Sequence, residues 1–244
     1  MIPAWLAFFD SLLAVALVAA GVLGAHFRYT PPFVGFQFFV LGFLLGILAF
    51  IIGVIGIFAT RNPMRARARP RAVVGTILGL FVMLPILAIV LTTTKYPAIN
   101  DITTDPNSPP EFVHAVELAP NHGRDMKYDK AKYAETQERG YGALAPLRMP
   151  EPPGDAFKAV QKAAAEMPGW EITFTDPAAH AIEGVATSSL FHFQDDFVIQ
   201  VRPAEAGGSL LEMRSKSRDG VGDLGVNYNR IKAFFAKVSP APGA

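Results

Sequence analysis

The chain has 244 residues, of which 51% are apolar, only 18% are charged and none is cysteine. The lack of cysteine excludes disulfides, cysteine metal ligands and a cysteine nucleophile. Residues 1–95 carry seven basic and one acidic side chain, whereas residues 96–244 carry 15 basic and 20 acidic ones. The acidic second part argues against nucleic acid as a partner, because nucleic-acid binding needs clustered positive charge.

Three apolar runs in the first part are each long enough to cross a membrane. They cover residues 5–24, 33–59 and 72–91, and about 20 helical residues span a hydrocarbon core. A signal peptide would begin with Lys or Arg, and residues 1–9 contain neither. We therefore expect residues 1–94 to form a three-helix transmembrane anchor.

The connection between the second and third runs predicts the orientation. It contains five arginines, namely Arg61, Arg65, Arg67, Arg69 and Arg71. Because positive charge in short loops marks the cytoplasmic side, we expect a cytoplasmic N-terminus and a periplasmic C-terminal domain, at the inner membrane of a bacterium. The same arginines could also bind anionic lipid headgroups.

Small residues recur in the second and third runs. Gly42 and Gly46 form one G-x-x-x-G pair, Gly75 and Gly79 form another, and Gly53 continues the first series. Small residues let helix backbones approach closely in lipid. We expect them to pack the chain's own three helices, and a docking face for another membrane subunit is the alternative.

The second part begins irregularly and then becomes periodic. Residues 95–154 are rich in proline, which predicts an extended tether with one short helix near residues 129–139. Periodicity then predicts a helix over 156–167, strands over 170–175, 181–190, 197–202 and 209–217, a helix over 226–238 and a tail over 239–244. Residues 155–238 should therefore form a two-layer α+β domain, a four-stranded antiparallel sheet flanked by two helices.

A polar cluster near the C-terminus is the candidate binding site. Arg214, Lys216 and Arg218 alternate along the last predicted strand, and a glycine-rich loop leads from them to the last helix. Arginine grips carboxylates or phosphates, and a helix N-terminus favours an anion. The candidate site for an anion or a partner consists of Arg214, Arg218, Gly220, Gly222, Asp223, Asn227 and Arg230.

The alternative for this cluster is an internal ion-pair network. In that arrangement Asp223 would cap the last helix, and the arginines would pair with Asp195, Asp196 or Glu183.

Other patterns in the sequence do not indicate catalysis, metal binding or cofactor binding. Residues 220–225 match G-x-G-x-x-G, but no further strand follows, and a dinucleotide site needs a βαβ unit. The five histidines lack metal-ligand spacing, and no serine has the context of a nucleophile elbow. We expect no cofactor, no metal site, no catalytic residue and no enzymatic activity.

Three segments of the second part carry a family resemblance: residues 169–171, 193–202 and 214–231. With the stretch 100–105, they resemble the "domain of unknown function 1499" family, in its form with N-terminal membrane spans. The resemblance implies no activity. It draws attention to the polar positions that match the family pattern, and Gln200 stands where that pattern leads us to expect Arg.

These observations predict a non-enzymatic membrane protein whose periplasmic domain binds or scaffolds a partner. It would be an accessory or assembly subunit of a membrane protein complex, or a homo-oligomer, in contact with membrane lipids. One alternative is a module that binds lipid or anionic headgroups. A second alternative is an envelope enzyme whose site the sequence does not reveal.

Overall fold

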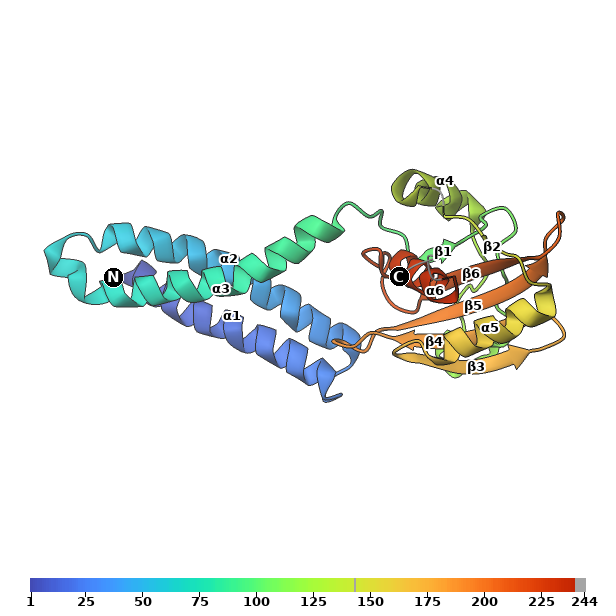
Figure 1. The fold of residues 1–244 in the computed structure, drawn as a ribbon. Helices are drawn as coiled ribbons and strands as arrows, with labels where there is room; N and C mark the ends of the chain where they lie inside the picture. The colour runs from blue at the N-terminus through green and yellow to red at the C-terminus, as the bar shows by residue number, and fades with distance from the viewer. Residues whose placement is uncertain (143, 240–244) are drawn as a thin grey trace. The chain divides into compact units, whose positions relative to one another are not determined.

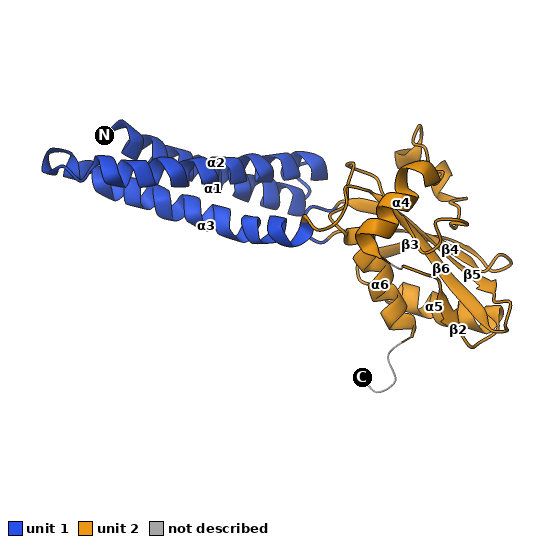
Figure 2. Ribbon diagram, turned by 90° about the horizontal axis from the view of Figure 1, so that it is seen from above, with its two compact units in different colours: residues 1–93, 189–192 blue, residues 94–188, 193–244 orange. Residues whose placement is uncertain are grey.

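The structure, a computed structural model, describes residues 1–142 and 144–239 (Figure 1). The chain forms two compact units, which Figure 2 colours separately. One contains residues 1–93 and 189–192, and the other contains residues 94–188 and the chain from residue 193 onward. Of the predicted tail, residues 240–244 lie outside the described residues.

The first unit is built from three long helices. They are α1 (Ile2–His26), α2 (Pro32–Ala59) and α3 (Arg69–Thr93), and a 3-10 turn (Pro63–Ala68) precedes α3. All three are long and apolar enough to cross a membrane. Large apolar side chains point outward, with Phe81 72% and Leu44 54% exposed, while most buried positions hold glycine or alanine. An apolar outer surface of this kind is typical of helices that contact lipid.

Glycine allows the three helices to pack closely. A Cβ atom added at any of the five predicted packing glycines would lie between 2.3 and 2.8 Å from an atom of a neighbouring helix: Gly42, Gly46, Gly53, Gly75 and Gly79. These distances are shorter than any van der Waals contact, so even alanine would push the backbones apart. The five glycines thus face the unit's own helices.

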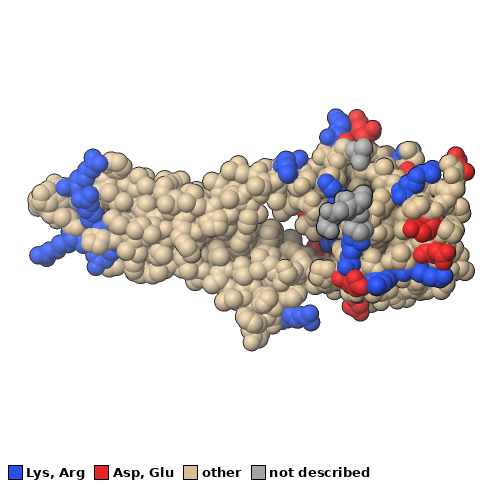
Figure 3. All heavy atoms as spheres, in the orientation of Figure 1, with Lys and Arg blue, Asp and Glu red and all other residues tan. Residues whose placement is uncertain are grey.

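Cationic side chains gather at one end of this unit, where α2 is connected to α3 (Figure 3). The guanidinium of Arg71 lies 4.0 Å above the Trp5 ring, and that of Arg61 lies 4.2 Å above the Phe58 ring. In these cation–π contacts each guanidinium is attracted to the face of an aromatic ring near a helix end.

The second unit contains a six-stranded antiparallel sheet, so the prediction of four strands is wrong. The strands are β1 (Asp101–Thr103), β2 (Leu147–Met149), β3 (Trp170–Asp176), β4 (Ala181–Thr187), β5 (Gln194–Pro203) and β6 (Ser209–Ser217). Their order is β1-β6-β5-β4-β3, and β2 also pairs with β6. The two missed strands have three residues each, too few to display the alternation that identifies a strand.

Residues 95–154, predicted as an extended tether, contribute β1, β2 and helix α4 (Lys130–Tyr141) to this unit. The Asp129 carboxylate caps α4 by accepting the N–H of Lys132. On α4, the Gln137 amide accepts the N–H of Thr103 at 3.0 Å and donates to the Thr103 carbonyl at 2.7 Å. Gln137 therefore replaces a neighbouring strand and closes the outer edge of β1.

Helices α5 (Pro153–Ala165) and α6 (Val226–Val238) supply the apolar cover of one sheet face. The Trp170 ring lies 4.1 Å from that of Phe197 and 5.2 Å from that of Phe234, all in the core between sheet and helices. The opposite face is polar and is covered in part by residues 104–129, where Phe112 and Met126 pack on Val198. Residues of the candidate site lie on both faces of the sheet.

Candidate functional site

Arg214 is the centre of a buried ion pair. It lies on β6 opposite β1, with Nε 2.8 Å from Asp101 Oδ1 and Nη2 2.8 Å from Asp101 Oδ2. Lys216 joins the same carboxylate, with Nζ 2.8 Å from Oδ2. Arg214 is 1% and Asp101 0% exposed. Because isolated buried charges are very costly, the two cations and the carboxylate stabilise one another.

Aromatic rings and a carbonyl enclose the Arg214 guanidinium further. It donates to the Met126 carbonyl at 2.9 Å and lies 4.8 Å from the Phe112 ring and 5.4 Å from the Tyr128 ring. Burial and the negative charge of Asp101 raise the pKa of the Tyr128 hydroxyl, so this ring stays neutral.

A second carboxylate, Asp196 on β5, neutralises two more arginines. Arg218 contacts both of its oxygens, with Nη2 2.7 Å from Oδ1 and Nε 3.1 Å from Oδ2. Arg124 approaches from the covering segment, with Nη1 3.3 Å from Oδ2. Arg218 also donates to the Gln194 side chain at 2.8 Å.

The remaining predicted polar residues lie on the other face of the sheet. Ser215 alternates with Arg214 and Lys216, so it faces α6, where its hydroxyl donates to Asn227 Oδ1 at 2.7 Å. Arg230 donates to Ser215 Oγ at 2.8 Å and forms an ion pair with Asp195. The predicted site residues are thus brought into two groups, one on each sheet face, rather than into one site.

Asp223 fixes the start of α6. Its carboxylate accepts the N–H of Gly225 at 2.9 Å and the N–H of Asn227 at 2.7 Å, and the Tyr141 hydroxyl lies 3.3 Å away. Burial raises the pKa of the Asp223 carboxyl, and the two backbone N–H groups oppose this. The pairings of Arg218 with Asp196 and Arg230 with Asp195, and this cap, are those expected for an internal network.

The loop glycines are held by the segment that precedes β1. The Gly220 carbonyl accepts the Asn100 side chain at 2.7 Å, and a Cβ on Gly222 would lie 3.0 Å from the Ala98 Cα. Both glycines thus allow the loop to lie against residues 98–100.

Glu183 organises the segment that covers the polar face. Its two carboxylate oxygens accept the backbone N–H groups of Val113, His114 and Ala115 at 2.6, 3.0 and 2.7 Å. Glu183 was one of the three expected partners of the arginines, but its carboxylate binds backbone donors 68 to 70 residues away in the chain.

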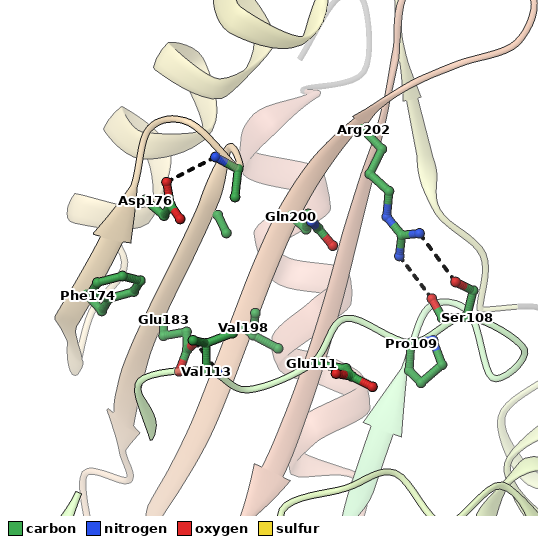
Figure 4. A pocket seen from close by; sticks show the side chains of 12 residues that line it. Ser108, Pro109, Glu111, Val113, Phe174, Asp176, Glu183, Val198, Gln200 and Arg202 are labelled. Carbon is green, nitrogen blue, oxygen red and sulfur yellow. Dashed lines mark hydrogen bonds between the residues drawn. The ribbon is translucent and has the colours of Figure 1, made fainter. Parts of the chain in front are cut away.

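A hollow of about 370 Å³ opens beside Glu183, and nothing in the sequence pointed to it (Figure 4). Its floor includes Phe174 and Val198, and Glu111 and Gln200 contribute polar side chains. Within the described part of the chain, neither of these two side chains has a hydrogen-bond partner, unlike the arginines above. Arg202, at one side, donates to the Ser108 carbonyl at 3.0 Å.

A second hollow, of about 310 Å³, lies on the same side of the sheet. Arg124, Lys127 and Arg214 line it together with the carboxylates Glu111 and Asp125. Cationic and anionic side chains therefore share its wall. Among the residues that the structure describes, no three His, Asp or Glu side chains gather in a way that could hold a metal ion.

Comparison with known proteins identifies a family without identifying an activity. The profile described as "Protein of unknown function (DUF1499)" matches residues 101–238, which include every strand and α4 to α6. Neither a curated protein nor a solved structure shows significant similarity to the chain. Because the match covers more than half of the sequence, the chain belongs to the DUF1499 family, here joined to three apolar N-terminal helices.

Proposed function

We propose that this protein is an accessory or assembly subunit of the inner membrane, whose periplasmic domain binds a partner protein through the hollow beside Glu183. The three apolar helices would be its anchor. The arginine-rich connection between α2 and α3 supports a cytoplasmic N-terminus, because short cationic loops stay on the cytoplasmic side.

The observation that carries this proposal is the contrast between two polar regions of the domain. Arg214, Arg218 and Arg230 each have a carboxylate partner inside the domain. Glu111 and Gln200 instead line a hollow, and within the described part of the chain neither side chain has a hydrogen bond or an ion pair. A buried charge that is already paired stabilises the fold, whereas unpaired polar groups beside apolar surface can recognise another molecule.

The walls of the hollow favour a cationic side chain of a protein. Glu111, Asp176 and Glu183 place three carboxylates at the hollow against one cation, Arg202, and Phe174 supplies an aromatic surface. Val113, which also lines it, is 66% exposed. A protein interface usually combines an apolar surface with a charged border. The aliphatic part of a Lys or Arg side chain would contact the apolar surface, and its charged end would contact the carboxylates.

The helices offer less to a partner than the domain does. Their packing glycines already contact neighbouring helices of the same unit. A partner that recognises this protein is therefore expected to contact the domain.

A photo-crosslinking amino acid at position 111 tests the proposal in the native membrane. We expect it to trap one partner at defined stoichiometry, which native mass spectrometry of mildly extracted protein would detect as well. The matched control is position 158, an exposed lysine on α5, which packs on the opposite sheet face. Equal labelling at both positions, or extraction of a lone monomer, would contradict the proposal.

The second candidate function is binding of an anionic lipid headgroup, favoured by the hollow that Arg124 and Lys127 share. Its test is lipid co-purification with the variant Lys127→Ala. Loss of a retained anionic lipid at an unchanged melting temperature would favour this function over partner binding.

A further inference from the structure

We propose that the loop between β6 and α6, together with the first residue of α6 (residues 218–226), docks on the lipid surface of the membrane that holds the chain. This inference rests on the proposal that α1 to α3 span that membrane, and it adds a second point of contact that is not a helix. Three features carry it: exposed apolar side chains, a rigid backbone and a short covalent link to α3.

The loop presents apolar side chains to the outside. Val221 is 84%, Leu224 51% and Val226 46% exposed. Leu224 also has a positive φ of 54°, an uncommon conformation for a bulky residue. Three large aliphatic side chains within six residues form an apolar patch whose exposure to water is unfavourable.

The loop backbone is held in place although its side chains point outward. The N–H of Asp223 donates to the Ile99 carbonyl at 3.2 Å, and Asn100 Nδ2 donates to the Gly220 carbonyl at 2.7 Å. Asp223 itself caps α6. The apolar side chains are therefore presented by a framework that is already ordered, so docking would cost little conformational entropy.

The covalent chain limits how far the loop can lie from the membrane. Gly225 packs on Tyr96 so closely that a Cβ there would be 2.5 Å from the ring. Tyr96 follows Thr93, the last residue of α3, by three residues, and three residues extend at most about 11 Å. The loop thus stays within reach of the bilayer surface for as long as α3 is embedded.

The surroundings of the loop have the composition of a membrane–water interface. The Tyr141 ring lies 5.4 Å from that of Tyr96 and 4.8 Å from that of Tyr228. Lys95 Nζ lies 5.0 Å above the Tyr96 ring, and Lys232 Nζ lies 5.4 Å above the Tyr228 ring. Tyrosine and lysine are favoured at this depth because each has an apolar body and a polar end.

The chain has no cysteine, so a single introduced cysteine can carry a fluorescent probe. The full chain with Val221→Cys is labelled with an environment-sensitive dye and reconstituted in phosphatidylcholine–phosphatidylglycerol vesicles. Lys158→Cys is the control, since this exposed side chain on α5 of the same unit is 76% accessible and lies outside the hollow beside Glu183. Val226→Cys is a second probe in case Val221→Cys disturbs the loop, and melting curves verify the fold of each variant.

We expect an aqueous quencher to act on the Val221 probe on the order of tenfold more slowly than on the Lys158 probe, since burying one aliphatic side chain shifts an equilibrium by that factor or more. Spin-labelled lipids should quench the Val221 probe only. Equal responses at both positions would overturn the inference. So would shielding in native membranes that is lost in lipid vesicles, because a protein would then cover the loop.

Failure of the membrane anchor itself is distinguishable. Alkaline extraction would release the unlabelled chain from vesicles if α1 to α3 did not span them, whatever the probes report. A chain that resists extraction while the loop probe stays fully accessible refutes the loop contact alone.

Discussion

Replacing Arg214 by alanine distinguishes two possible roles of this side chain, a stabilising ion pair and a ligand-binding site. In the structure this guanidinium makes two 2.8 Å contacts with Asp101 and one 2.9 Å contact with the Met126 carbonyl. Alanine removes all three. It leaves a buried carboxylate that only Lys216 still neutralises.

The expected loss follows from burial. Removing one partner of a buried pair destabilises a protein by about 3–5 kcal/mol, because the other charge stays desolvated. Lys216 keeps one contact with Asp101, which places the loss near the lower end of that range. At about 2–4 °C per kcal/mol for a unit of this size, a loss of about 3 kcal/mol should lower the melting temperature by roughly 6–12 °C.

The assay is thermal unfolding of the full chain in detergent, followed by circular dichroism. Arg139→Ala is the control, since the Arg139–Glu135 pair on α4 is exposed, with side chains 72% and 78% accessible. An exposed pair contributes about 0–1 kcal/mol, so the control should melt within a few degrees of the unaltered protein. Equal melting of both variants, with loss of a bound anion only from Arg214→Ala, would refute the ion-pair interpretation.

Three further predictions address the helices, the α6 cap and the orientation. Gly79→Val should destabilise the helical unit by about 1–3 kcal/mol, since a Cβ there would lie 2.6 Å from a backbone nitrogen of α2. The control Ala20→Val, at an exposed position of α1, should leave the stability nearly unchanged. Burial raises the pKa of the Asp223 carboxyl above its ordinary value of 3.8. The protonated carboxyl therefore favours the folded state below pH 3.8, and this contribution to stability is lost as the pH rises. Denaturant titrations should show the advantage of the unaltered protein over Asp223→Asn shrinking from pH 4 toward pH 7. A membrane-impermeant thiol reagent added from the periplasm should label Lys158→Cys, and should label Met64→Cys, 91% exposed, only after the inner membrane is opened.

Each of these has a clear contrary result. Equal unfolding of the two helix variants would mean that the glycine contacts do not limit packing. An Asp223→Asn deficit that grows with pH would place the carboxyl pKa below its ordinary value. Labelling of Met64→Cys alone in cells with an intact inner membrane would reverse the orientation.

The regular elements were predictable because their patterns are local. The last helix was predicted over 226–238 and is α6, Val226–Val238, and the strand predicted over 209–217 is β6. Apolar length alone located the three long helices. In each case the residues that determine the element lie within the element.

The contacts of the candidate site were less predictable because they are long-range. The partner of Arg214 is Asp101, 113 residues earlier, in a strand too short to display a period. Alternation correctly placed Arg214 and Lys216 on one face. The same alternation puts Ser215 on the other face, and that separates Asn227 and Arg230 from Arg214.

The pairing of β1 with β6 has a consequence for synthesis of the protein. Asp101 leaves the ribosome well before Lys216, its register partner, which follows 115 residues later. At about 5–20 residues per second, the nascent chain waits on the order of 10 s before its sheet can close. During that interval Ile102 has no β6 to pair with and stays uncovered, so a chain that stalls before β6 is an exposed target for chaperones and proteases.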